Sequence, residues 1–274
     1  MKIAFLQYNP LYLQVETNLD RVESLLHQVE ADLIVLPELF ASGYFFKSKD
    51  DLSQVAEAVP EGPTTERLAA WAKATGAVLV AGLPERAGDH IYNSAVVVTP
   101  EGYVGTYRKI HLFYQEKLYF APGDLGFRVF DVHDRNGTAY RLGVMICFDW
   151  IFPEAARSLA LQGADVIAHP ANLVLPNCPR AMPIRALENH VYTITANRYG
   201  QESNQGELLT FIGQSVICSP DSSVLVKAPG DADCFGVADI DPSAARDRQI
   251  TAFNDLFGDR RTEMYVAEAL REAM

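Results

Sequence analysis

Long apolar runs are missing from this sequence of 274 residues. Stretches such as Gly76–Pro84 and Leu142–Phe148 are far shorter than the roughly 20 residues of a membrane-spanning helix, and the apolar stretch after Lys2 is too short for a signal peptide. Positive charge is also scarce, since 23 Lys and Arg stand against 35 Asp and Glu and the net charge is −12. We therefore expect no nucleic-acid or membrane partner, and predict a cytoplasmic protein that acts on a small molecule.

Cysteine is scarce as well. No two of the four cysteines form a CxxC pair, and they are widely spaced, at Cys147, Cys178, Cys218 and Cys234. We therefore expect neither a disulfide framework nor a structural zinc site. A reduced cysteine is usually a small buried hydrophobe, so only its position in the fold can indicate catalysis.

Short apolar runs alternate with helical patterns along the chain. Strands are predicted over Lys2–Gln7, Leu33–Leu36, Val78–Ala81, Ser94–Val98, Val191–Ala196, Gln214–Ser219, Ser223–Val226 and Phe235–Ile240. Helices are predicted over Asn18–Glu30, over Thr65–Thr75 and after Cys147. This alternation is typical of an α/β protein with mainly parallel, buried strands.

The second half of the chain resembles the first. A strand, a helix and another strand extend from Lys2 to Glu38, and the same order recurs from Arg141 to Asn172. No linker or low-complexity stretch interrupts the chain. We therefore expect one domain over residues 1–274, with 242–274 a charged tail that packs on the body or on a partner subunit.

Two chemically interesting residues end equivalent strands, where α/β proteins place their ligand sites. Glu38 follows the apolar run Leu33–Pro37, and partial burial suits an acid to proton exchange near neutral pH; a helix cap or a surface acid is the alternative. Cys147 precedes a helix that Asp149 is expected to cap, so its thiol meets the positive end of the helix dipole and the Phe148 N–H can face an oxyanion. A core cysteine is the alternative here.

Three segments together resemble a known family. They are Leu36–Glu38, Tyr107–Leu112 and Cys147–Glu154, and in this order they resemble the signatures of the nitrilase superfamily of carbon–nitrogen hydrolases. The resemblance covers essentially the whole chain and is greatest to compact archaeal and bacterial amidase/nitrilase-like members. By itself, Lys109 in the second segment would fit a surface lysine equally well.

The resemblance implies a four-layer αββα sandwich, a homodimer or higher homo-oligomer, and no metal or organic cofactor. It also implies a catalytic triad in which Glu38 is the general base, Lys109 the oxyanion partner and Cys147 the nucleophile. Glu116 matches a second glutamate of the family, and we expect it to orient Lys109 or the substrate amide.

Further residues are expected around this triad. The Phe148 N–H is a candidate oxyanion donor, and the candidate pocket residues are Trp150, Asn172, Tyr44 and Phe113, although aromatic residues near strand ends are often core. Asp149 and Trp150 also fit architectural roles. An inward Arg180 would favour a substrate carboxylate, but the exposed alternative is preferred, and Arg185 is spaced to pair with Glu188.

Other site types have less support. His111, His169 and His190 are nominal partners for a papain-like cysteine, but none lies in a matching motif. A metal site lacks any paired ligand spacing. A catalytically silent binding module on the same fold is disfavoured because all three triad positions are filled.

The substrate class depends on the residues after the nucleophile. Phe148-Asp149 resembles the amidase and carbamoyl-amidase branches, whereas nitrilases commonly have Trp-Glu. We therefore predict hydrolysis of a small amide or N-carbamoyl compound through a Cys147 thioester, with aliphatic mono- or dinitriles as the alternative substrates.

Overall fold

Two six-stranded sheets form the centre of the computed structural model, which describes residues 1–265. The first sheet has the order β14-β1-β2-β3-β4-β5 and consists of β1 (Lys2–Gln7), β2 (Leu33–Val35), β3 (Val78–Ala87), β4 (His90–Thr99), β5 (Gly102–Arg108) and β14 (Cys234–Asp239). The second has the order β13-β12-β9-β8-β7-β6 and consists of β6 (Val129–His133), β7 (Ala139–Val144), β8 (Val166–Ala171), β9 (Tyr192–Asn197), β12 (Val216–Cys218) and β13 (Val224–Lys227).

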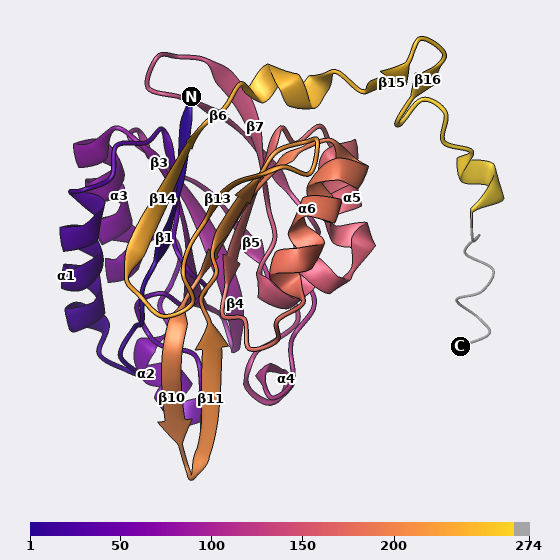
Figure 1. Ribbon diagram of the computed structural model, residues 1–274. Coiled ribbons are helices and arrows are strands. Elements are labelled where there is room, and N and C mark those ends of the chain that lie inside the picture. Colours follow the sequence, from indigo (N-terminus) through magenta and orange to yellow (C-terminus); the bar gives the residue numbers. More distant parts are fainter. Residues whose placement is uncertain (266–274) are drawn as a thin grey trace.

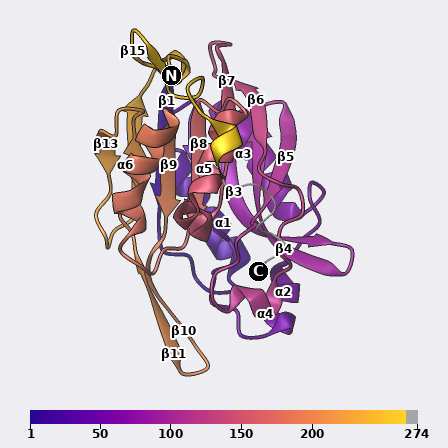
Figure 2. The ribbon, with the colours of Figure 1, turned by 90° about the vertical axis from the view of Figure 1, so that its right-hand side faces the viewer.

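Helices cover the outer face of each sheet (Figure 1). The first sheet is covered by α1 (Val15–Leu26) and α3 (Pro63–Thr75), and the second by α5 (Pro153–Leu161) and α6 (Cys178–Asn189), as Figure 2 also shows from the side. The layers are therefore helix, sheet, sheet and helix, and the predicted αββα sandwich is confirmed.

The central strands are largely apolar because both of their faces are buried. Along β1, Ile3 and Phe5 belong to the core between the sheets, whereas Ala4 and Leu6 belong to the core under α1 and α3. Successive strand residues point to opposite faces, so a central strand of this sandwich needs an apolar residue at every position.

The internal repeat is confirmed, but the sheets are less parallel than expected. The units β1–α1–β2 and β7–α5–β8 each join two parallel strands, and β3 and β9 extend these parallel sets. The outer strands β4, β5, β6, β12, β13 and β14 pair antiparallel with their neighbours. The turn at residues 220–223 joins β12 to β13 as a hairpin.

Several predicted boundaries differ from the structure. The first helix covers Val15–Leu26 rather than Asn18–Glu30. Asp149 does not cap α5, because a short 3₁₀ helix over Cys147–Ile151 intervenes and Phe152 takes the cap position. The sequence patterns also missed β6 and four smaller elements. The four are α2 (Lys49–Val55), α4 (Glu116–Tyr119), β10 (Tyr199–Asn204) and β11 (Glu207–Ile212). β10 and β11 form a hairpin that projects beyond the sandwich in Figures 1 and 2.

The tail begins on the body and then leaves it (Figure 1). Its elements are the 3₁₀ helix Pro242–Arg246, β15 (Gln249–Thr251), β16 (Asn254–Asp255) and the 3₁₀ helix Thr262–Met264. Arg246 pairs with Asp165 at 2.8 Å, and the Phe257 ring lies 4.9 Å from the Arg157 guanidinium. Residues 266–274 of the predicted tail lie outside the described residues, and both the single domain and the partner contact stay predictions. No helix within residues 1–265 has the length and apolarity to span a membrane.

One close backbone approach in the first sheet yields a prediction. A Cβ on Gly82 of β3 would lie 2.6 Å from Glu38 Cα and 2.8 Å from Leu39 N, both backbone atoms. Gly82→Ala should therefore lower the free energy of unfolding by about 1–3 kcal/mol, measured by urea denaturation. Gly230→Ala, whose Cβ would meet only Ile212 O at 3.2 Å, is the control. Equal stability of the two variants would contradict this account.

Candidate active site

The three predicted triad residues follow strands that end at one edge of the sandwich. Glu38 lies three residues after β2, Lys109 directly follows β5, and Cys147 lies three residues after β7. All three side chains are buried. Lys109 Nζ lies 2.6 Å from Glu38 Oε1 and 2.8 Å from Glu116 Oε1, so one ammonium joins two carboxylates.

Burial and this lysine set the proton affinity of Glu38. Burial raises the pKa of Glu38 to about 7, and the Lys109 ammonium opposes a further rise. Asn93 Nδ2 donates to Glu38 Oε1 at 2.7 Å, whereas Oε2 is buried and has no hydrogen-bond partner within residues 1–265. Glu38 therefore has one anchored oxygen and one oxygen free to take up a proton near neutral pH.

Lys109 keeps its charge. Burial alone would lower the pKa of Lys109, but the carboxylates of Glu116 and Glu38 outweigh burial and hold that pKa above its usual value. An ammonium group has three donor positions, and these two carboxylates use two of them. One donor remains for a further acceptor.

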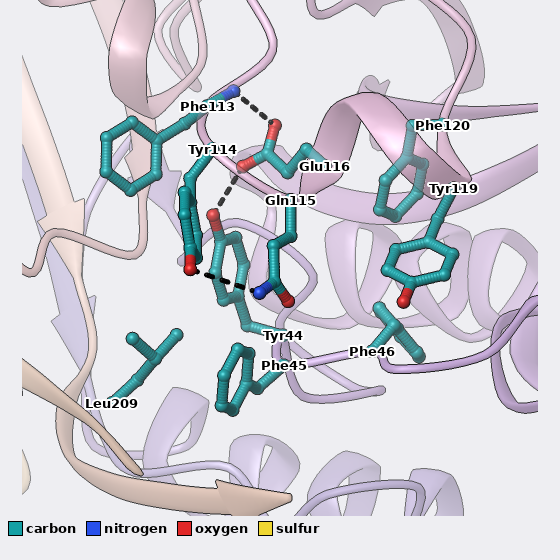
Figure 3. Close-up of a pocket in the computed structure, with 10 residues that line it drawn as sticks. All are labelled: Tyr44, Phe45, Phe46, Phe113, Tyr114, Gln115, Glu116, Tyr119, Phe120 and Leu209. Atoms are coloured by element: carbon teal, nitrogen blue, oxygen red, sulfur yellow. Dashed lines mark hydrogen bonds between the residues drawn. The ribbon is translucent and has the colours of Figure 1, made fainter. Parts of the chain in front are cut away.

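Glu116 is buried, so it is not a surface acid. It begins α4, and its carboxylate accepts hydrogen bonds from the Phe113 N–H at 3.2 Å and the Tyr44 hydroxyl at 2.6 Å (Figure 3). With Lys109 as a third partner, the carboxylate is fixed in one orientation. The expected orienting contact to Lys109 is thus present.

Cys147 has a strained backbone. Its φ is +41°, in the left-handed region that residues other than glycine rarely adopt. Such strain persists only where neighbouring groups enforce it, and it concentrates at functional sites. Here the Cys147 carbonyl accepts from His169 Nε2 at 2.9 Å, and the preceding Ile146 N–H donates to the Asp149 carboxylate at 2.9 Å.

His169 is therefore a support of the cysteine rather than its base. Burial lowers the pKa of His169 to about 4, so the ring is neutral, and its Nε2–H donates a hydrogen bond to the Cys147 carbonyl. Nδ1 lies 3.0 Å from the Thr195 hydroxyl and accepts from it. Sequence reasoning missed this role, although a histidine inside the apolar run of β8 was a visible signal.

The Cys147 thiol is protonated at rest. Burial and the Glu38 charge raise the pKa of Cys147 well above its usual value, although Lys109 and a hydrogen bond from the Asn172 backbone act in the opposite direction. The helix that starts at Cys147 is a five-residue 3₁₀ turn, so the expected benefit of a long helix dipole is absent. The thiol needs a base, and Glu38 is the titrating neighbour.

Four of the five predicted pocket residues line a hollow beside the cysteine. Its lining is Phe113, Cys147, Phe148, Trp150, Asn172, Leu173, Val174 and Leu175. Tyr44 instead lines an adjoining aromatic pocket that shares Phe113, where its hydroxyl points at Glu116 (Figure 3). Asn172 Nδ2 donates to the Glu38 carbonyl at 2.9 Å, so it also ties two of the strand ends together.

The remaining candidates lie apart from this chemistry. Arg180 is exposed, as preferred, and Arg185 pairs with Glu188 at 2.7 Å and donates to the Trp150 carbonyl. Asp149 is architectural, as predicted, because its carboxylate also accepts from the Tyr107 hydroxyl at 2.7 Å. In the part of the chain that the structure describes, no group of three or more His, Cys, Asp and Glu side chains is placed to hold a metal ion.

Comparisons with known proteins identify the family of this chain. Residues 2–249 match the family model described as carbon-nitrogen hydrolase. A protein named nitrilase from Pyrococcus abyssi is 53% identical over 268 residues, which cover 97% of this chain and 99% of that protein. An N-carbamoylputrescine amidase from Solanum lycopersicum is 34% identical over 275 residues, covering 92% of this chain and 89% of that protein.

A solved structure is similar over nearly the whole chain. It is an amidase from Nesterenkonia sp. AN1 that carries the acetamide moiety of fluoroacetamide at its active-site cysteine. Its TM-score is 0.77 at 26% identity, and the match covers 96% of this chain and 94% of that one. This chain therefore belongs to the carbon-nitrogen hydrolase family of the nitrilase superfamily, and it is an enzyme that hydrolyses carbon–nitrogen bonds.

The Glu38–Cys147 pairing can be tested by alkylation. Glu38→Gln should slow the reaction of Cys147 with iodoacetamide near neutral pH by at least about tenfold, because no base takes the thiol proton. Peptide mass spectrometry would follow the modification, with the fully buried Cys178 as an internal control that stays unmodified in both proteins. Equal rates at Cys147 in wild type and variant would rule out Glu38 as its base.

Proposed function

We propose that this enzyme hydrolyses a small amide or N-carbamoyl compound through a thioester on Cys147. The observation that carries the proposal is the buried Glu38–Lys109 pair, 2.6 Å apart, beside a cysteine whose strained backbone is braced by His169. A cysteine with only a packing role needs neither a titrating acid beside it nor a strained backbone held in place by its neighbours.

In the first half-reaction, Glu38 takes the thiol proton and the sulfur attacks the carbonyl carbon. The carbonyl oxygen becomes an oxyanion, which the third donor of Lys109 and the Phe148 N–H stabilise. Glu38 then gives its proton to the departing nitrogen, the carbon–nitrogen bond breaks, and ammonia or an amine leaves a thioester on Cys147.

In the second half-reaction, Glu38 takes a proton from water while the water oxygen attacks the thioester carbon. A second oxyanion forms in the same place and collapses to release the acid, and the proton returns to the sulfur. Glu38 thus changes protonation state twice in each half-reaction, which suits a pKa of about 7.

The hollow itself favours a small substrate that carries an N–H group. It is a small, open hollow with a cavity volume of about 20 Å³, and most of its lining is apolar. Asn172 Oδ1, in that lining, is buried and has no hydrogen-bond partner among the described residues. An amide or carbamoyl N–H could satisfy this acceptor, whereas a nitrile has no N–H to offer.

Nitrile hydrolysis is the second candidate. The Pyrococcus abyssi relative named nitrilase is 53% identical, a higher value than the 34% of the tomato carbamoyl amidase. With an aliphatic mono- or dinitrile, the first adduct would be a thioimidate, which water attacks with Glu38 as base; ammonia then leaves and the thioester remains.

We also propose a homodimer. Three apolar side chains on the outer helices, Leu161 of α5 with Ile184 and Leu187 of α6, are exposed in the single chain, and a second copy could cover them. Light scattering of the purified protein measures the mass of the particle in solution, which should be twice that of one chain. The cytoplasmic location stays a prediction from the sequence.

Ammonia release is the direct test of the activity. Wild type should release ammonia from at least one class among aliphatic amides, N-carbamoyl amines and aliphatic nitriles, and Cys147→Ala should lose the activity by at least about a thousandfold. The best substrate class decides between the two candidates. Activity that survives in Cys147→Ala would refute the thioester, and a folded wild type inert on every class would refute the proposal.

The pH dependence follows from Glu38. The base must be ionised, so kcat/KM should fall as the pH decreases through about 7, the value to which burial raises the pKa of Glu38. Glu116→Gln removes a charge that raises the pKa of Glu38, so the acid limb of the kcat/KM profile should move to lower pH. The variant should also be slower than wild type. An acid limb near the usual carboxyl value in wild type would contradict the role of Glu38.

A further inference from the structure

Glu202 is a buried acid on the projecting β10–β11 hairpin, far along the chain from the triad. It is only 6% exposed. Its Oε2 accepts from the backbone N–H of Tyr44 at 3.0 Å and of Phe45 at 2.7 Å. A carboxylate with two backbone donors holds that segment of chain in one conformation.

Glu202 is itself fixed from the other side. The fully buried Arg198 pairs with it, and the same guanidinium donates to Asn9 Oδ1 at 2.7 Å and to the Pro10 carbonyl at 3.2 Å. The guanidinium also lies 4.0 Å from the centre of the Phe211 ring on β11. The base of the hairpin is therefore a rigid anchor.

The segment that Glu202 holds reaches the active site through one side chain. The Tyr44 ring packs edge-on against Phe211, with ring centres 5.8 Å apart. Its hydroxyl donates to Glu116 Oε1 at 2.6 Å (Figure 3). Lys109 Nζ contacts the same oxygen at 2.8 Å. Tyr44 thus connects the hairpin to the carboxylate that orients the lysine.

We propose that Glu202 is a positioning residue for catalysis: by fixing the Tyr44 backbone, it keeps the Tyr44 hydroxyl on Glu116 and so holds Lys109 between Glu116 and Glu38. The inference rests on the proposed function of Glu38, Lys109 and Cys147. It assigns a role to the hairpin, which also adds Leu209 to the wall of the aromatic pocket.

The physical effect is on charge as well as position. Burial raises the pKa of Tyr44 well above its usual value, so its hydroxyl remains a donor throughout an assay. Without this donor, Glu116 would keep only Lys109 and the Phe113 N–H as partners and would repel Glu38 more strongly. The charged or titrating groups that act on Glu38 are Lys109 and Glu116, with Cys147 beside them, and a shift of this balance appears in the pH profile.

The experiment is a double-mutant cycle on Glu202→Gln and Tyr44→Phe. Each single variant should lower kcat by about tenfold with little change in KM, because misplaced groups slow the chemistry more than the binding. Each should move the acid limb of kcat/KM to higher pH. The double variant should resemble the single variants, because both changes break the same connection.

The direction of the pH shift separates positioning from simple charge loss. Removal of the Glu202 anion by itself would stabilise the ionised form of Glu38 and move the limb to lower pH. Tyr140→Phe is the matched control, because its buried hydroxyl has no partner within residues 1–265 and its loss should change neither kcat nor the limb. Circular dichroism and thermal unfolding would confirm that each variant is folded.

Other outcomes would overturn the inference. They are a Glu202→Gln variant that only loses stability, a limb that moves to lower pH, or effects of the two changes that simply add. If Glu202→Gln does not fold, Glu202→Asp keeps the charge but is too short for both N–H groups and takes its place in the cycle. If wild type shows no turnover, the proposed function fails instead, and the alkylation rate of Cys147 in the same variants tests the positioning.

Discussion

The interaction on which the site depends is the buried ammonium of Lys109 between Glu38 and Glu116. Burial of a charge is costly unless it is paired and hydrogen-bonded, and removal of one partner from such a set typically costs about 3–5 kcal/mol. Two carboxylates and one ammonium carry an excess negative charge, which the structure relieves with neutral donors from Asn93 and Tyr44. Burial, with a smaller contribution from the Glu116 charge, raises the pKa of Glu38 to about 7, so the same burial that endangers stability produces a usable base.

The sandwich supplies the rigidity that this arrangement needs. The two parallel units bring the ends of β2 and β7 to one edge, and the Asn172 side chain, just after β8, binds the Glu38 carbonyl. At Cys147, the left-handed backbone is held by His169 from β8 and, through Ile146, by Asp149. These groups come from different elements, so the thiol can be presented only when the sheets are packed.

The β10–β11 hairpin adds to the rigidity of the site from outside the sandwich. Two of its contacts with the site are a carboxylate on two backbone N–H groups and one aromatic ring against another. Neither contact touches the reacting atoms. Both restrict the position of Tyr44 and hence of Glu116. A small displacement of a group beside the buried charges can lower the catalytic rate by a large factor.

The sequence by itself determined the alternation of buried strands and helices and the internal repeat, because an apolar run or a helical spacing is a local property. It also indicated Glu38, Lys109 and Cys147 through three short segments in order, and Glu116 through a further match to the same family. Tertiary structure decided what these residues experience: the pKa of Glu38 depends on burial and on a lysine 71 positions away. The roles of His169 and Glu202 escaped the sequence for the same reason, since Glu202 meets its backbone partners across 157 and 158 positions, and no local pattern encodes such a contact.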